Sequence, residues 1–234
     1  MLNTVFLIPI DHRGIHGKLF HQYLDLQSWC EKNNSQILTC NGLFLNFARN
    51  FLATGGKGNY DTRPAEAEWL FWIDSDIQFN IEQIDYLHRV DPKHKFVTGW
   101  YKSDQSDTAM VGKWDEEYFR EHLHMPFYSA DFMEKKAAES PTKLIKADWC
   151  GFGFTKVHRS IYEKMEYPYY PLNPVEIKGC RNPNGEGKID MKDMSFEDVS
   201  FCNNCYATTG IKPLVVPKLR VGHLKSFLVY FFFF

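Results

Sequence analysis

Hydrophobic and polar positions divide the first hundred residues into two kinds of segment. Apolar runs at residues 5–10 and 69–73 predict strands buried on both faces, and two further short strands are predicted at 36–40 and 96–101. Between them, apolar residues recur at helical spacing over residues 15–32, 43–52 and 81–90. This regular alternation predicts an α/β fold with a mixed, mainly parallel central sheet flanked by helices.

The pattern is less regular after residue 101. It predicts helices at 114–123, 157–165 and 196–207 and strands at 143–147 and 214–216. Segments rich in Gly and Pro predict loops at residues 55–68 and 167–187. Neither an internal repeat nor a low-complexity linker divides the sequence, so we predict one domain over residues 1–234.

Charge and cysteine usage narrow the class of protein. The net charge of −2 excludes a basic coating for nucleic acid or anionic lipid, although it allows a local basic pocket. Aromatic residues make up 16% of the chain, which argues against disorder and suits a packed core or a site for ring-shaped ligands. Six cysteines in a chain of this size, together with an N-terminus unlike a signal peptide, predict a soluble cytoplasmic protein with reduced thiols. Cys202 and Cys205 form a single CxxC pair, which favours two helical cysteines over a zinc site.

The last eight residues, 227–234, form an apolar run. A run this short cannot span a bilayer as a helix, which takes about 20 residues, so we expect no transmembrane segment here. We expect a final strand or packed tail, and a domain cut from a longer chain is a second explanation.

An acidic pair marks the strongest candidate site. Asp74 and Asp76 directly follow the apolar run 69–73, and residues two apart in an extended chain point to the same side. They would lie at the carboxyl end of a central strand, where open α/β sheets bind ligands. Two carboxylates there suit Mg²⁺ or Mn²⁺ shared with substrate phosphates. The plainer alternative is that Asp76 caps a helix.

Other site signatures are incomplete. Lys57 in a glycine-rich stretch is followed by Gly58 rather than Ser or Thr, so the stretch is no P-loop. Gly151 and Gly153 lack the third glycine of a dinucleotide fingerprint, and the sequence has no GxSxG nucleophile motif.

Six segments of the sequence, taken in their order along the chain, resemble a GT-A-fold, nucleotide-sugar-dependent glycosyltransferase with a DxD motif. The resemblance covers nearly the whole chain and rests on residues 8–11, 46–50, 72–76, 148–154, 196–198 and 221–223. The compact size is similar to that of glycosyltransferase domains encoded by large algal viruses. The family resemblance implies a nucleotide-binding half at residues 1–101 and an acceptor-binding and catalytic half at 102–234. The similarity to the viral domains implies a virus-encoded protein that acts in a host cell.

The resemblance implies a role for each matching position. Asp74, Asp76 and His223 would form the metal site for Mn²⁺ or Mg²⁺. The ion would assist departure of the diphosphate from a nucleotide-sugar donor, for which UDP is favoured. Donor contacts would come from Pro9, Asp11, Arg13, Arg49, Asp74, Ser75 and Lys225.

The resemblance also implies an acceptor side. Asp198 would be the general base of an inverting transfer to a glycan or glycoconjugate hydroxyl, with Glu197 as the second choice. Trp149, Gly151 and Phe152 would contact the acceptor, the rings by stacking on a sugar. Each role has a plainer alternative that stays open. Asp198 could only cap a helix, and His223 could be a histidine packed at a strand end. Arg49 could be a surface cation, and Trp149 could be a core residue.

Two other functions compete with this prediction. A sugar-nucleotide nucleotidyltransferase would share the sheet and the acidic residues, but it normally carries a Gly-rich, Arg-containing loop after the first strand. Residues 11–14 are a poor match for such a loop. A non-catalytic carbohydrate-binding module would explain the aromatic residues but would leave the acidic pair without a role.

Overall fold

A seven-stranded sheet forms the centre of the molecule in the computed structural model, which describes residues 2–11, 14–103 and 106–224. The strand order is β2 (Ser35–Asn41), β1 (Leu2–Ile10), β3 (Ala67–Ile73), β10 (Phe154–His158), β5 (Phe96–Trp100), β13 (Leu214–Arg220) and β8 (Ile145–Lys146). β1 pairs in parallel with β2 and β3, and β13 pairs in parallel with β5. β10 and β8 run antiparallel to their neighbours. The predicted mixed, mainly parallel α/β sheet is thus confirmed.

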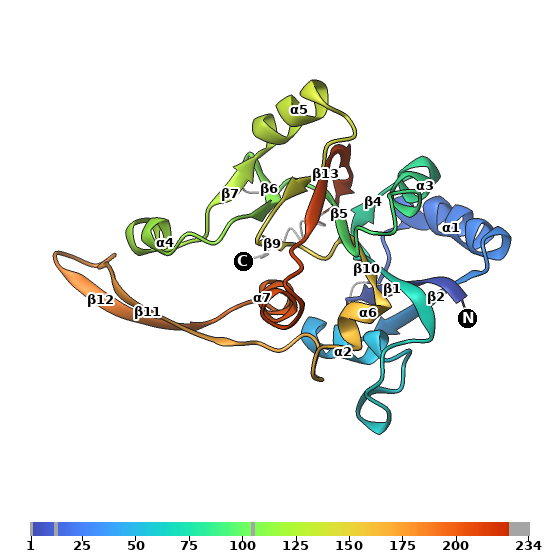
Figure 1. The fold of residues 1–234 in the computed structure, drawn as a ribbon, viewed down its shortest axis with the longest axis horizontal. Coiled ribbons are helices and arrows are strands. Elements are labelled where there is room, and N and C mark those ends of the chain that lie inside the picture. The colour runs from blue at the N-terminus through green and yellow to red at the C-terminus, as the bar shows by residue number, and fades with distance from the viewer. Residues whose placement is uncertain (1, 12–13, 104–105, 225–234) are drawn as a thin grey trace, which may run out of the picture.

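Helices cover both faces of this sheet (Figure 1). On one face, α1 (Phe20–Lys32) and α3 (Ile81–His88) bury Leu26, Trp29, Ile84 and Leu87 against Phe6 and Phe71. On the other face lie α2 (Leu45–Ala53), α6 (Arg159–Tyr162) and α7 (Glu197–Thr209). Each face has its own apolar cluster, so the sheet sits between two cores.

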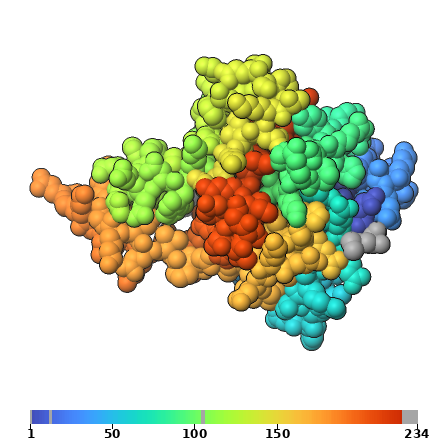
Figure 2. Space-filling view, in the orientation of Figure 1, coloured from blue at the N-terminus to red at the C-terminus, as the bar shows by residue number. Residues whose placement is uncertain are grey.

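Smaller elements surround the sheet. A three-stranded sheet contains β7 (Phe127–Ser129), β6 (Thr108–Gly112) and β9 (Trp149–Cys150), and it carries α4 (Glu116–His122) and α5 (Ala130–Glu139) nearby. β4 (Ile77–Gln78) pairs with β14 (Gly222–His223). Two short 3₁₀ turns, η1 (Gly17–Leu19) and η2 (Gly58–Tyr60), precede α1 and β3. β11 (Pro174–Arg181) and β12 (Lys188–Met194) form an arm that projects from the body, orange in Figure 2.

The structure corrects two predicted elements. The helix expected at residues 157–165 is confirmed only in part: α6 covers Arg159–Tyr162, whereas residues 157 and 158 belong to β10, which inserts antiparallel between β3 and β5. Lys156 of β10 is only 2% exposed, and its Nζ donates to the carbonyls of Leu87 and His88 at the end of α3. The loop expected at residues 167–187 is wrong in its middle part, where Pro174–Arg181 form β11 of the arm.

No helix in the described part of the chain is long and apolar enough to cross a membrane. Arg13, Lys225 and the apolar run at residues 227–234 lie outside the described residues, so the predictions made for them stay predictions.

Candidate functional site

The acidic pair lies at the carboxyl end of β3, as the sequence predicted. The main chain turns here, with the Ile77 amide donating to the Asp74 carbonyl at 3.0 Å and the Asp74 amide donating to the Gly153 carbonyl at 3.1 Å. The turn leads into β4, whose partner β14 carries His223. This pairing brings the end of the described chain to the acidic segment, and the Leu224 amide donates to the Asp76 carbonyl at 2.8 Å.

Asp76 and His223 form a pair suited to a divalent ion. Oδ2 of Asp76 lies 3.3 Å from Nε2 of His223. Two ligands at right angles on an octahedral Mg²⁺, each about 2.1 Å from the ion, lie roughly 3 Å apart. A carboxylate and an imidazole also match the ligand preferences of Mn²⁺. Both side chains keep some exposure, 30% for Asp76 and 15% for His223, so an ion could reach them from solvent.

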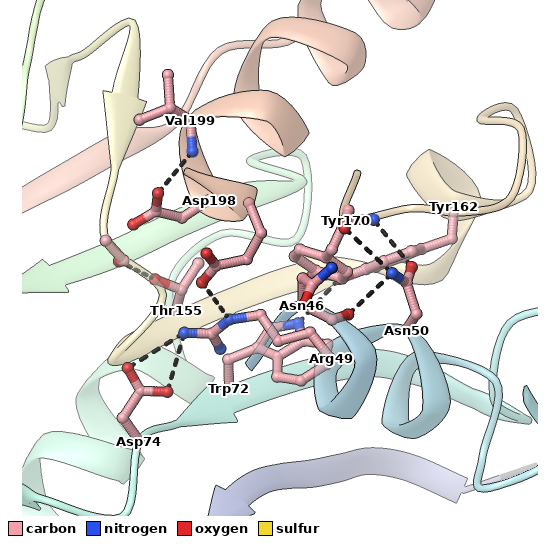
Figure 3. A network of polar contacts seen from close by, with 12 residues as sticks. Asn46, Arg49, Asn50, Trp72, Asp74, Thr155, Tyr162, Tyr170, Asp198 and Val199 are labelled. Carbon is pink, nitrogen blue, oxygen red and sulfur yellow. Dashed lines mark hydrogen bonds and ion pairs between the residues drawn. The ribbon is translucent and has the colours of Figure 1, made fainter. Parts of the chain in front are cut away.

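Asp74 does not join this pair. The described residues contain no group of three or more His, Cys, Asp or Glu side chains placed to hold one metal ion. Instead, Nη2 of Arg49 donates to Oδ1 and Oδ2 of Asp74 at 3.0 and 3.2 Å (Figure 3). The structure therefore brings together two of the three predicted metal ligands, Asp76 and His223.

Arg49 joins two elements that are distant in the sequence. It lies on α2 and is 1% exposed, and its Nε donates to Oε1 of Glu197 on α7 at 3.2 Å. The guanidinium carbon lies 5.4 Å from the ring centre of Trp72 and 5.6 Å from that of Phe152. Burial alone would lower the pKa of Arg49, but Asp74 and Glu197 outweigh it and raise that pKa above its ordinary value. The side chain therefore stays charged.

Asp198 has the environment of a general base. It follows Glu197 in the first turn of α7, and its Oδ1 accepts a hydrogen bond from the Val199 amide at 2.7 Å. Burial and then the like charge of Glu197 raise the pKa of Asp198 to about 7, against the opposing effect of Arg49. A carboxylate with a pKa near neutrality can accept and release a proton at working pH.

Two predicted acceptor residues are core residues. Phe152 is fully buried and packs edge to face against Trp72 and Phe201. Trp149 is 4% exposed, packs edge to face on Phe127, and donates from Nε1 to the Lys113 carbonyl at 3.3 Å. Neither ring offers a face to a sugar, which corrects the stacking role expected for them.

Gly151 allows an aromatic side chain to approach the Asp76–His223 pair. A Cβ at this position would lie 2.3 Å from the hydroxyl of Tyr101, and one at Gly153 would lie 2.8 Å from the same ring. The Tyr101 ring in turn lies 5.0 Å from that of His223. The sequence analysis missed Tyr101 as a site residue, and its only signal was its place at the end of a predicted strand.

The predicted donor residues in the described range lie at the same edge of the sheet. Pro9 is buried near the carboxyl end of β1, and Asp11 follows that strand. Ser75, between the two aspartates, is 6% exposed. Because β1 and β3 pair in parallel, their carboxyl ends meet beside the acidic segment.

Comparisons with known proteins reveal a likeness in structure. No protein-family model matches the sequence, and no curated protein matches it. The solved structure of A197 from STIV aligns with a TM-score of 0.52 at 14% identity, over 96% of this chain and 87% of that one. GalNAc-T7, solved with UDP, GalNAc and Mn²⁺, aligns with a TM-score of 0.52 at 12% identity, over 97% of this chain and 44% of that one.

This chain thus spans less than half the length of the GalNAc-T7 chain. A glycosyltransferase involved in glycosylation of the major capsid of PBCV-1 also matches, at a TM-score of 0.32 and 13% identity over 72% of this chain, which is too distant to support an argument. At such identities the likeness establishes the fold rather than the chemistry. The chain has the fold of GT-A glycosyltransferases.

Proposed function

We propose that this protein is a metal-dependent glycosyltransferase that moves a sugar from a nucleotide-sugar donor to a hydroxyl of a glycan or glycoconjugate. The observation that carries the proposal is the pairing of Asp76 with His223 at 3.3 Å, at the carboxyl edge of a sheet with the GT-A fold. The raised pKa of Asp198 supplies a base at the same site. UDP is the favoured nucleotide, in keeping with the UDP and Mn²⁺ named for the GalNAc-T7 structure.

In this proposal each residue has one task. Asp76 and His223 hold Mn²⁺ or Mg²⁺, which when bound neutralises the negative charge of the diphosphate leaving group. Asp198 accepts the proton of the acceptor hydroxyl while its oxygen bonds to the anomeric carbon on the side opposite the departing nucleoside diphosphate, so this single displacement inverts the anomeric centre. Glu197 is a poorer base because the residue is only 7% exposed and its carboxylate already accepts a hydrogen bond from Arg49. Pro9, Asp11 and Ser75 border the nucleotide, and residues 1–101 and 102–234 form donor and acceptor halves of one domain.

A thermal-shift experiment tests the proposal. UDP at about 100 times its Kd should stabilise the protein by ~2.7 kcal/mol in the presence of Mn²⁺, which is roughly 5–10 °C for a chain of this size. Asp76→Ala should lose the Mn²⁺-dependent part of this shift, because it removes one of two ligands. Asp25→Ala, an exposed carboxylate on α1, is the matched control and should keep the full shift.

The same measurement can contradict the proposal. UDP, GDP and CMP should be compared with and without Mn²⁺. If none of them stabilises the protein in a metal-dependent way, the nucleotide-sugar chemistry is wrong. If UDP does stabilise the protein in a metal-dependent way, a screen for hydrolysis of different UDP-sugars would identify the transferred sugar.

A further inference from the structure

We infer that Arg49 is a positioning residue that fixes Asp74 and Glu197 relative to each other, rather than a ligand of the donor phosphates. The inference rests on the proposed function, because it assigns Arg49 a role in the same site. It replaces the donor contact that the resemblance implied for Arg49.

The contacts of the guanidinium carry the first step. Nη2 donates to both carboxylate oxygens of Asp74, and Nε donates to Glu197 at 3.2 Å (Figure 3). The side chain is 1% exposed and its carbon lies near the rings of Trp72 and Phe152. The buried guanidinium thus links the end of β3 to the first turn of α7.

The position of the two carboxylates carries the second step. Asp74 is held by Arg49 while Asp76 faces His223, so the two members of the acidic pair have different partners. Glu197 directly precedes Asp198 in α7, so holding Glu197 also fixes the turn that carries the proposed base. Without a cation at position 49, Asp74, Glu197 and Asp198 would repel one another in a half-buried site.

The geometry also explains why the residue is arginine. A planar guanidinium presents donors in several fixed directions, whereas a lysine has one compact ammonium group. Lysine at position 49 would keep the charge but could not hold two carboxylates in the same arrangement. The remaining nitrogen, Nη1, is buried and has no hydrogen-bond partner within the described part of the chain. A direct contact with the donor would have to use this one atom.

The variant Arg49→Lys distinguishes between a positioning role for Arg49 and direct binding of the donor phosphates. The measurements are the Kd of UDP with Mn²⁺ by titration calorimetry, and kcat and KM for hydrolysis of the UDP-hexose that the wild-type protein turns over fastest. For a positioning residue we expect the Kd and KM to change less than ~3-fold and kcat to fall at least ~10-fold. Arg89→Lys, in an exposed i,i+4 pair with Asp85, is the control and should change neither. A Kd for UDP raised ~10-fold or more with kcat retained would overturn the inference.

A stability experiment tests the same clamp without any activity. Arg49→Met should lower the midpoint of urea unfolding, because it leaves two carboxylates facing each other without a cation. Adding Asp74→Asn and Glu197→Gln to that variant should raise the midpoint again, since the repulsion is removed. A triple variant no more stable than Arg49→Met alone would overturn the clamp. Failure of the proposed function would appear differently, as a wild-type protein that binds no UDP with Mn²⁺.

Discussion

Individual carboxylates at one edge of the sheet have different environments. Asp76 lies beside an imidazole, at 3.3 Å from His223. Asp74 is held by Arg49, although burial still raises its pKa above the ordinary value. Burial and the like charge of Glu197 raise the pKa of Asp198 to about 7. These different neighbours are consistent with the different roles proposed for the three carboxylates, a metal ligand for Asp76, an anion held by Arg49 for Asp74 and a base for Asp198.

Asp198→Asn is expected to stabilise the protein at high pH while removing activity. The folded-state pKa of about 7 exceeds the ordinary value of about 3.9. The folded protein therefore holds this proton more tightly, and wild-type stability falls as the pH rises from about 4 to 7. At pH 8 the variant should be more stable than wild type by ~1–3 kcal/mol. Urea unfolding at pH 5 and pH 8 measures the difference.

The control and the kinetics complete this test. Asp25→Asn on α1 should show no such difference between the two pH values. Glycosyl transfer by Asp198→Asn should fall by ~10²–10⁴-fold, and wild-type activity should decline below about pH 7 as the base is protonated. An equal stability difference at both pH values would contradict the raised pKa. The groups that influence Asp198 are Glu197, Arg49 and Asp74, with Cys202 and Tyr101 nearby.

At the scale of elements, the connection between β9 and β10 packs against Tyr101, whose ring lies next to His223. Gly151 and Gly153 leave space for the ring of Tyr101, which follows β5 and faces His223. The two segments are distant in sequence, and β10 brings them together because it lies between β3 and β5. Space for the Tyr101 ring therefore accounts for glycine at positions 151 and 153, without any nucleotide-binding fingerprint.

Gly151→Ala should disturb this packing. The new Cβ would lie 2.3 Å from the Tyr101 hydroxyl, so the ring must move or the strand connection must shift. We expect a loss of ~1–3 kcal/mol in stability, as for overpacked cores, together with weaker Mn²⁺-dependent binding of UDP. Gly17→Ala is the matched control, because a Cβ there meets no atom within 4 Å. Unchanged stability of Gly151→Ala would contradict the close packing of Tyr101 against this glycine.

At the scale of the whole molecule, stability comes from the two apolar clusters rather than from the site. Val5, Leu7 and Trp72 belong to one cluster, and Phe6 and Phe71 belong to the other. Adjacent residues of β1 and β3 therefore point into opposite cores, as the alternation of a strand requires. The proposed metal ligands lie at the edge of this arrangement and contribute little buried apolar area.

A chelator should therefore leave the nucleotide-free protein folded. EDTA is expected to change its melting temperature by less than about 2 °C, which corresponds to under ~1 kcal/mol for a chain of this size. The same treatment should remove the Mn²⁺-dependent stabilisation by UDP. Unfolding by EDTA in the absence of nucleotide would mean that a metal ion is part of the fold itself.

Local patterns in the sequence were sufficient to predict the first half of the fold. Continuous apolar runs and helical spacing predicted β1, β3 and β5 and the helices α1, α2 and α3, because each pattern is local. The sequence also predicted the acidic segment after β3, and the ordered motifs led to the GT-A fold. α7 was predicted on the same grounds, at residues 196–207 against an observed Glu197–Thr209.

Tertiary structure alone decided the partners of these residues. No local pattern could show that Lys156 is buried in β10, that Trp149 and Phe152 belong to the core, or that Arg49 holds Asp74. These outcomes depend on contacts between residues far apart in the chain, and on free energies of burial and ion pairing that exist only once the segments meet. Residue type and spacing therefore predicted where a site could form, while packing decided which side chains face one another in it.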